Sequence, residues 1–233
     1  MSMQRDNRPQ QLPLVFNHEP ASGRDDLVVS DPVSAAASII DRWPEWPSPV
    51  VIITGPAGSG KSHLATVWQQ RCGATPIFGD AQADAVALAG QGPVLFEDAD
   101  RSPIDETALF HVINQVRSAG TSLLITARTW PLSWGVVLPD LVSRLKAATV
   151  VEIGPPDDAA LTQILFKLFA DRQLLVDERL VAYIVSRMER SLEAAQAIVQ
   201  RLDSLALARG VRISRALAGD VLNEMGRDAD ADA

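Results

Sequence analysis

Hydrophobic and polar positions follow two different patterns on either side of residue 154. Up to that point, short continuous apolar runs rich in β-branched residues recur at 50–54 (VVIIT), 75–78 (TPIF), 94–98 (VLFED), 122–126 (SLLIT) and 149–153 (TVVEI). Stretches with helical spacing lie between them at 61–71, 81–89 and 105–119. Because continuous apolar strands joined by helices are typical of a parallel sheet covered on both faces, residues 25–154 are predicted to form an α/β core.

Beyond that core the strand pattern gives way to helical stripes. Apolar residues stand at i, i+3, i+4 and i+7 at Leu161, Ile164, Leu165 and Leu168. This spacing places side chains on one face of a helix, and similar stripes recur at 180–185, 192–206 and 214–225. Residues 155–226 are therefore predicted to form a small all-helical domain, and the acidic ending 227–233 is expected to be disordered.

The first 24 residues are polar and rich in Gln, Asn, Pro and Asp, so they are predicted to form a flexible tail. One apolar segment, QQLPLVF at 10–16, interrupts this tail. It is too short and too close to proline to build a core of its own. We therefore expect it either to bind a partner or to fold back onto its own core. A helix over 33–40 and a proline-interrupted linker, RWPEWPSP at 42–49, lead into the core.

Composition narrows the class of protein. The 233 residues carry a formal net charge of −8, and no dense Lys/Arg run is present, so autonomous binding to duplex DNA is not expected. A single cysteine, Cys72, excludes a disulfide framework. No run of 18 apolar residues occurs, and no basic region leads into an apolar one at the N-terminus. A cytoplasmic protein without a membrane span is the expectation.

A glycine-rich segment directly follows the first predicted strand and opens the next helix. Its residues are Gly55, Pro56, Ala57, Gly58, Ser59, Gly60, Lys61 and Ser62. This spacing and context match the P-loop, in which glycines let backbone N–H groups surround the β-phosphate of a nucleotide at a helix N-terminus. Lys61 is expected to bridge the β- and γ-phosphates, and the Ser62 hydroxyl to ligate Mg²⁺. Because lysine is rare in this chain, the match is specific.

Acidic residues end the third predicted strand, where they are expected to face the nucleotide. We assign Glu97 to the metal ion and Asp98 to activation of the attacking water. Thr126, at the end of the next strand, is a candidate for contacting the γ-phosphate or that water. The alternatives are a solvated strand end for the two acids and a structural hydroxyl for Thr126. His63, beside the P-loop, is a further candidate for nucleotide binding, although a lone histidine there more often packs or faces solvent.

Two arginines stand at positions from which they could act on a nucleotide. Arg144, in LVSRL, comes just before the last predicted strand, and Arg190, in ERSLEAA, begins a helix of the second domain, from which it could fold back onto the phosphates. An isolated arginine is more often solvated or paired with an acid, so the residues alone leave both roles open.

The ordered set GPAGSGKS, VLFEDAD, LLITA, LVSRL and ERSLEAA resembles the AAA+ module of the bacterial initiator family DnaA, and more closely its short Hda-like relatives, the regulatory inactivators. The resemblance covers about residues 25–226. It implies an AAA+ P-loop NTPase fold with a helical lid that binds ADP or ATP with Mg²⁺. By this similarity, Arg144 matches the arginine finger that reaches a neighbouring subunit's nucleotide, and Arg190 matches the sensor arginine of the lid.

Hda-like proteins also place a short motif before the AAA+ core that binds the DNA polymerase sliding clamp. Gln11, Leu12, Leu14 and Phe16 stand at the matching positions here. The resemblance thus implies two partners, the clamp (β subunit) and DnaA. Its implied function is negative regulation of replication initiation, through stimulated ATP hydrolysis that leaves inactive ADP-DnaA. A homo-oligomer is also compatible with the AAA+ class.

Two departures from the family pattern affect the site. Glu97-Asp98 replaces the two aspartates of DnaA, and Ala127-Arg128 replaces Ser-Asp, so intrinsic ATPase activity is expected to be weak at most. The chain ends after the predicted lid, where DnaA continues into a helix-turn-helix domain for origin DNA, and sequence-specific DNA binding is therefore not expected. Two alternatives stay open. One is a stand-alone P-loop ATPase or kinase, and the other is a DnaA-like origin-binding initiation factor.

Overall fold

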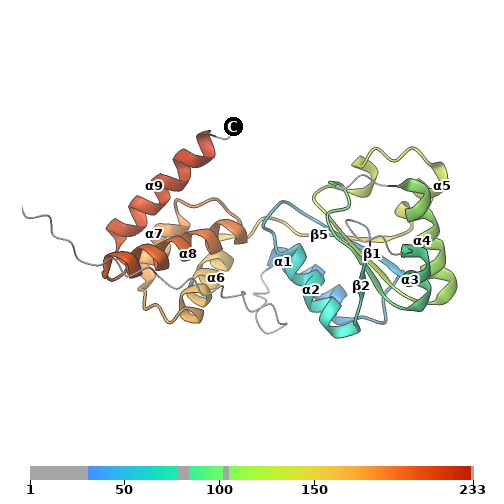
Figure 1. The fold of residues 1–233 in the computed structure, drawn as a ribbon, viewed down its shortest axis with the longest axis horizontal. Coiled ribbons are helices and arrows are strands. Elements are labelled where there is room, and N and C mark those ends of the chain that lie inside the picture. Colours follow the sequence, from blue (N-terminus) through green and yellow to red (C-terminus); the bar gives the residue numbers. More distant parts are fainter. Residues whose placement is uncertain (1–30, 78–83, 102–104, 232–233) are drawn as a thin grey trace, which may run out of the picture.

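The computed structural model describes residues 31–77, 84–101 and 105–231, which form a parallel sheet with helices on both faces and a separate group of helices (Figure 1). Within these ranges the sheet has five strands in the order β2-β3-β4-β1-β5. Their bounds are β1 Val50–Thr54, β2 Thr75–Pro76, β3 Val94–Phe96, β4 Leu123–Ala127 and β5 Thr149–Glu152. Every strand pair is parallel, so all carboxyl ends lie along one edge.

Helices cover both faces of this sheet. The helices on one face are α1 Asp31–Asp41 and α2 Lys61–Cys72, and those on the other are α3 Ala85–Gln91, α4 Glu106–Ala119 and α5 Pro139–Lys146. Alternate residues of β1 serve the two faces: Val51 and Ile53 pack toward α1 and α2, while Val50 and Ile52 pack toward α3 to α5. Both sets are buried, which explains why the central strand is apolar without interruption.

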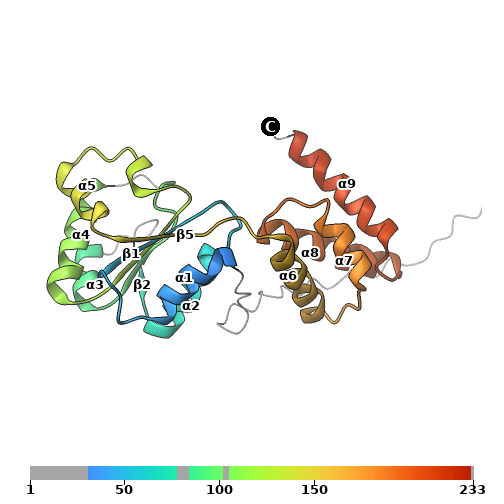
Figure 2. The same ribbon diagram turned by 180° about the vertical axis from the view of Figure 1, so that it is seen from behind.

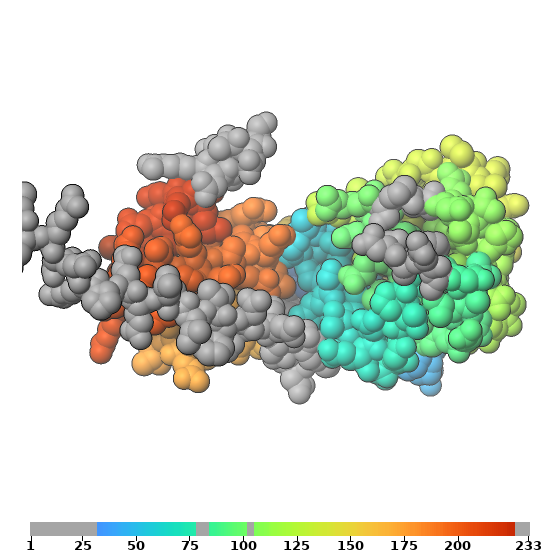
Figure 3. Space-filling view, in the orientation of Figure 1, coloured from blue at the N-terminus to red at the C-terminus, as the bar shows by residue number. Residues whose placement is uncertain are grey.

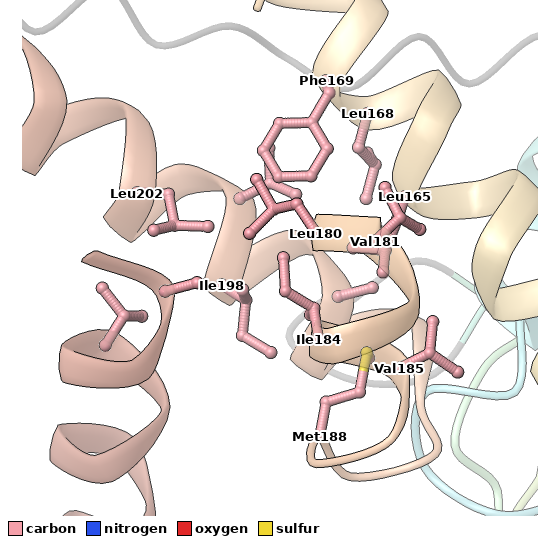
Figure 4. Close-up of a cluster of buried hydrophobic side chains, with 14 of the residues drawn as sticks. Leu165, Leu168, Phe169, Leu180, Val181, Ile184, Val185, Met188, Ile198 and Leu202 are labelled. Carbon is pink, nitrogen blue, oxygen red and sulfur yellow. The ribbon is translucent and has the colours of Figure 1, made fainter. Parts of the chain in front are cut away.

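The second domain, here called the lid, follows β5 and contains only helices among its described residues. They are α6 Asp158–Asp171, α7 Glu178–Val185, α8 Leu192–Arg209 and α9 Arg215–Ala231. Phe169 of α6, Val181 of α7 and Leu202 of α8 are fully buried in a core that belongs to the lid alone (Figure 4). Because the lid has its own hydrophobic core, it can move against the sheet domain as a body.

The lid and α5 lie at opposite ends of the molecule, as the two ribbon views agree (Figures 1 and 2). In the space-filling view the lid touches the sheet domain beside the cyan segment that runs from β1 into α2 (Figure 3). A backbone hydrogen bond of 2.8 Å marks this contact, donated by the amide of Leu192 to the carbonyl of Gly58. The lid therefore rests on the loop between β1 and α2.

Most of the predicted fold is confirmed, with differences at element ends. The strand expected over 75–78 is shorter, because β2 covers only Thr75–Pro76 and residue 78 lies outside the described part of the chain. Glu97 and Asp98 follow β3 instead of ending it. The last helix was expected to stop near Met225, which is wrong, since α9 continues to Ala231. Alanine has the highest helix propensity and recurs through this ending, which favours continuation.

The two tryptophans of the linker pack against a tryptophan of α2. Trp46 stacks on Trp68 of α2 with ring centroids 5.2 Å apart, and Trp43 meets the same ring edge-on at 6.5 Å. The indole N–H of Trp46 donates to the carbonyl of Ile39 at 2.7 Å. The linker is thereby anchored to the α1–α2 face. No helix in the described ranges is long and apolar enough to cross a membrane.

Candidate functional site

The sheet order brings the candidate residues together at one edge. β4 lies between β1 and β3, so the loops after these three strands are neighbours. The amide of Gly55, the first residue after β1, donates to the carbonyl of Ala127 at 3.2 Å. On the other side, the amide of Ala99 donates to the carbonyl of Thr126 at 2.9 Å. Segments that are distant in sequence are thus joined by backbone hydrogen bonds at the carboxyl edge.

Three glycines give the loop after β1 its shape. Gly55, Gly58 and Gly60 have φ of +154°, +66° and +96°, which are backbone conformations that residues with a side chain rarely adopt. A Cβ at Gly55 would clash with the carbonyl oxygen of Ile153, whereas a Cβ at Gly60 would meet nothing within 4 Å. The space over Gly60, directly before α2, is therefore open. This is the place where a phosphate would meet the helix N-terminus.

Lys61, the first residue of α2, turns its ammonium group into the loop. Its Nζ donates to the carbonyls of Gly55 at 2.8 Å and Pro56 at 2.7 Å, and only 6% of the residue is exposed. Burial lowers the pKa of Lys61, and the nearby charges of Asp98 and Arg128 act in opposite senses, the first raising it and the second lowering it. A buried ammonium satisfied by uncharged carbonyls is well placed to bind an anion.

A hydroxyl and a carboxylate that could bind a metal ion lie beside Lys61. The hydroxyl of Ser62, in the first turn of α2, is near enough to the carboxyl of Glu97, after β3, to act on its pKa. Although the Glu97 residue is exposed overall, partial burial of its carboxyl raises the pKa, the Ser62 hydroxyl lowers it, and the charge of Asp98 adds to the rise. A hydroxyl and a carboxylate that lie near each other suit Mg²⁺, which prefers oxygen ligands and usually takes its remaining ligands from waters and phosphate oxygens. The described residues contain no cluster of three or more His, Cys, Asp or Glu for an all-protein metal site.

Asp98 has an unusual backbone. Its φ of +49° lies in the left-handed region, where residues other than glycine are uncommon. The Asp98 amide donates to Oγ1 of Thr126 at 3.1 Å, which helps to hold this conformation. Thr126 is only 1% exposed, so its hydroxyl supports the Asp98 turn. Its contact with a γ-phosphate and the role of Asp98 in water activation stay predictions.

The sequence did not single out Asp100, which organises the next loop. Its carboxylate accepts from the amide of Arg128 at 3.0 Å, and from both the amide and the hydroxyl of Thr129 at 2.9 Å. Burial acts to raise the pKa of Asp100, but these hydrogen bonds outweigh it, and the pKa is lowered. The only signal in the sequence was a third acid in the EDAD stretch at 97–100, after β3. Asp100 fixes the backbone where Arg128 leaves the sheet.

Arg190 lies beside the loop but is engaged within the lid. Its Nη2 contacts Oδ1 of Asp158, in the first turn of α6, at 2.9 Å. Both side chains are more than half exposed, so this pair contributes little to stability. The following residue, Ser191, caps α8 by accepting from the amide of Ala194 at 3.0 Å. Arg190 therefore stands next to the Leu192–Gly58 contact and can exchange Asp158 for another anion.

Arg144 is not brought to this edge. It lies in the last turn of α5, at the end of the molecule opposite the lid in both ribbon views (Figures 1 and 2). No hydrogen bond or ion pair engages its guanidinium within the described residues. His63 is half-buried in the first turn of α2, and its role at the nucleotide stays a prediction. Gln11, Leu12, Leu14 and Phe16 lie outside the described residues.

The sheet order, the P-loop with its lysine and the helical lid define the AAA+ class of P-loop folds. Within that class the likeness is to DnaA. Domain III of the Thermotoga maritima replication initiation protein DnaA superposes with a TM-score of 0.73 at 17% identity, over 88% of this chain and 97% of the domain. The initiator DnaA bound to AMPPCP and single-stranded DNA gives 0.66 at 16% identity, over 79% of this chain and 65% of DnaA.

Sequence comparison agrees with this likeness. The chromosomal replication initiator protein DnaA of Sphingopyxis alaskensis is 25% identical to this chain. The alignment is 251 positions long, gaps included, and covers 95% of this chain. The chain spans only 55% of the length of that relative. No protein-family model matches the chain.

Proposed function

We propose that this chain is a DnaA-related AAA+ regulator that binds ATP or ADP with Mg²⁺ in the pocket between its P-loop and its lid. The observation that carries the nucleotide assignment is the position of Lys61. Its buried ammonium lies in the P-loop, the space over Gly60 is open, and Ser62 next to it is near enough to Glu97 to act on the pKa of that carboxyl. A DnaA with the same fold binds AMPPCP, which supports this assignment.

The residues of this pocket are better suited to holding a nucleotide than to rapid hydrolysis. Lys61 would neutralise phosphate oxygens, and Ser62 with Glu97 would hold Mg²⁺, which supplies charge compensation when bound. Asp98 would orient water, but its backbone is held in a left-handed turn by Thr126. We therefore infer weak intrinsic turnover at most, with the nucleotide serving to set the angle between the sheet domain and the lid.

We further propose that Arg144 acts on the nucleotide of a neighbouring DnaA molecule. Two observations support this: the guanidinium is unengaged within the described residues, and α5 lies at the end of the molecule distant from the chain's own P-loop. An arginine delivered in trans compensates the charge that develops on the γ-phosphate as water attacks it. The product would be ADP-DnaA, which no longer initiates replication.

The clamp motif supplies the location for this reaction. We propose that Leu14 and Phe16 enter an apolar groove of the sliding clamp and that Gln11 satisfies polar groups at its rim. Burial of two such side chains is worth a few kcal/mol, at about 1.5–3 kcal/mol each, less the cost of ordering the segment. The clamp would thus concentrate the regulator on replicated DNA.

A DnaA-like initiation factor is the second candidate, since the DnaA relative of this fold binds single-stranded DNA. An initiation factor needs a basic surface that binds the phosphates of DNA, and the net charge of −8 argues against such a surface in this chain. A filter-binding titration with single-stranded DNA separates the two functions. Tight binding that weakens steeply with salt favours the initiation factor.

The experiment that tests the proposed function loads DnaA with ATP labelled in its γ-phosphate and follows phosphate release. We expect faster release only when both this chain and DNA-loaded clamp are present. The double variant Leu14→Ala/Phe16→Ala should still bind nucleotide but should lose clamp capture and stimulation. If the chain alone hydrolyses ATP at an enzyme-like rate and leaves DnaA unaffected, it is a stand-alone ATPase or kinase.

A further inference from the structure

A groove opens between two loops of the lid, one joining α6 to α7 and the other joining α8 to α9. Its volume is about 480 Å³, within the ~300–1,000 Å³ that is typical of ligand sites. Apolar side chains and two cations contribute to its lining: Leu175, Val176, Leu180 and Ile213, with Arg179 and Arg215.

The loops beside this groove are already ordered by hydrogen bonds. The amide of Leu174 donates to the carbonyl of Phe169, in the last turn of α6, at 2.9 Å. Asp177 caps α7 by accepting from the amide of Leu180 at 2.8 Å, and the Ser214 hydroxyl accepts from an amide in the first turn of α9 at 3.3 Å. Because the groove is formed in advance, an occupant does not have to order the lid.

Leu175 extends the apolar lining into solvent. It is 98% exposed, whereas its neighbours Leu174 and Val176 pack against the lid core. A single exposed leucine is ordinary on a protein surface, but this one borders an apolar groove. The leucine and the groove together form one apolar surface on which a peptide can dock.

Positive charge surrounds the groove. No hydrogen bond or ion pair engages Arg179 in the part of the chain that the structure describes. The guanidinium of Arg215 lies 4.5 Å from the ring centre of Tyr183, and that of Arg187 lies 4.2 Å from the same centre. The acid of the lining, Asp177, already accepts the hydrogen bond that caps α7. The groove therefore favours an occupant that has a carboxylate beside its apolar side chains.

The N-terminal part of this chain contains a segment of that kind, the apolar stretch at 12–16, which Glu19 follows. The described chain begins at α1, on the side of the sheet domain that faces the lid in both ribbon views (Figures 1 and 2). α1 also meets the start of the lid, since a Cβ at Gly154 would lie 3.5 Å from Cβ of Pro32. The first described residues are thus next to the lid.

Residues 17–30 are long enough to carry the segment to the groove. The groove lies beyond the far end of α6, a helix of 14 residues that is about 21 Å long. The extended length of residues 17–30 is about 50 Å, more than the length of that helix. A segment tethered in this way faces the groove at an effective concentration on the order of millimolar, so even weak docking is populated.

We propose that the segment 12–16 docks into the groove of this chain's own lid and that the docked form cannot bind the sliding clamp. The inference rests on the proposed clamp-binding role of Leu14 and Phe16, because the same two side chains would fill the groove. Glu19 would meet the cations at its rim. The lid would thereby regulate capture of this chain by the clamp.

Clamp affinity measures this competition. Full-length protein is titrated with the sliding clamp for the wild type and for Leu175→Ser/Arg179→Glu, in which both altered residues are exposed. We expect this groove variant to bind the clamp about three- to tenfold more tightly, because the docked fraction lowers the apparent affinity of the wild type. Leu207→Ser is the matched control, since Leu207 is a lid leucine that is 67% exposed and does not line the groove. It should bind the clamp as the wild type does.

Hydrogen exchange supplies a readout that does not need the clamp. The amides of residues 174–180 and 213–215 should be better protected in the wild type than in Leu14→Ala/Phe16→Ala. This difference should not change with protein concentration, because docking occurs within one chain. Protection that rises with concentration would assign the groove to a second copy and would contradict the inference.

The remaining outcomes separate this inference from the function on which it rests. If the groove variant binds the clamp no more tightly than the wild type, or if Leu207→Ser shows the same gain, the inference is wrong while the clamp-binding role stands. If neither the wild type nor any variant binds the clamp, the proposed clamp-binding role is wrong. Hydrogen exchange then decides alone whether the segment occupies the groove.

Discussion

The backbone amide of Leu192, the first residue of α8, donates a hydrogen bond of 2.8 Å to the carbonyl of Gly58 in the P-loop. The contact is close on both sides, since a Cβ at Gly58 would lie 2.7 Å from Cβ of Ser191. An amide at a helix N-terminus has no partner within its own helix, so the P-loop supplies one. A change in the P-loop is therefore transmitted directly to the lid.

Gly58→Ala should displace the lid. The new methyl group would clash with Ser191, and alanine at φ +66° carries a backbone cost of about 1–2 kcal/mol. Overpacking typically costs a further ~1–3 kcal/mol, so we expect the free energy of unfolding to fall by the sum of the two costs. Urea denaturation measures the loss, and hydrogen exchange should show reduced protection of the Leu192 amide.

Gly73→Ala isolates the backbone part of that effect. Gly73 has φ +69°, but a Cβ there would meet nothing within 4 Å. The free energy of unfolding of Gly73→Ala should fall only by the backbone cost, and the Leu192 amide should stay protected from exchange. Adding Ser191→Gly to Gly58→Ala should restore part of the loss, because a glycine cap costs only a few tenths of a kcal/mol. Equal losses for Gly58→Ala and Gly73→Ala would show that the lid contact does not matter.

Asp158→Ala should strengthen nucleotide binding by releasing Arg190. The Arg190–Asp158 pair is exposed and worth about 0.2–1 kcal/mol, which sets an upper limit of about fivefold on the gain. Calorimetric titration with ADP and Mg²⁺ measures it. The matched control is Glu224→Ala, which breaks an equally exposed lid pair with Arg201. A gain with both variants, or a loss with Asp158→Ala, contradicts the exchange of Asp158 for phosphate.

Glu97→Gln should increase stability at neutral pH in the absence of Mg²⁺. Partial burial of the carboxyl raises the pKa of Glu97, and because the residue is exposed overall the effect is small, so the folded protein binds this proton slightly more tightly than the unfolded chain. The stability that it contributes is full below the unfolded pKa and is lost as pH rises through the raised folded pKa. The glutamine variant removes this loss. Urea denaturation from acid to neutral pH should show the two proteins diverging as pH rises.

The same substitution should weaken Mg²⁺-dependent binding of ADP, because the carboxylate form of Glu97 is the proposed metal ligand. In the wild type, that binding should weaken as pH falls through the raised pKa, and the variant should lack this component. Comparison of the two proteins at each pH cancels the titration of the nucleotide itself. Identical Mg²⁺ dependence in both proteins would remove Glu97 from the metal site.

The sequence predicted the features that local patterns determine. The run from Val50 to Thr54 is a strand over the expected residues, because its uninterrupted apolar character has no other use than burial on two faces. The P-loop was predicted from its glycines and from Lys61, since only these residues permit its backbone and charge. Helix starts and stops followed caps such as Asp105 and Gly120.

Features that depend on tertiary packing were not predictable in this way. The ion pair of Arg190 with Asp158 joins residues whose distance is set only when the lid helices pack. The importance of Asp100 depends on where β4 ends relative to β3, which a single sequence does not reveal. The turn at Asp98 requires a partner hydroxyl from Thr126, on another strand.

The proposal that this chain acts on the nucleotide of DnaA depends on Arg144. The most direct measurement is the single-turnover rate of ATP hydrolysis on DnaA, with DNA-loaded clamp and either wild-type protein or Arg144→Ala. Lys146→Ala is the control, because this exposed cation lies in the same last turn of α5. We predict that Arg144→Ala binds clamp and nucleotide normally but loses stimulation by about 10³-fold or down to the unstimulated rate, as for other arginine fingers, while Lys146→Ala remains active. Full stimulation by Arg144→Ala would contradict the account.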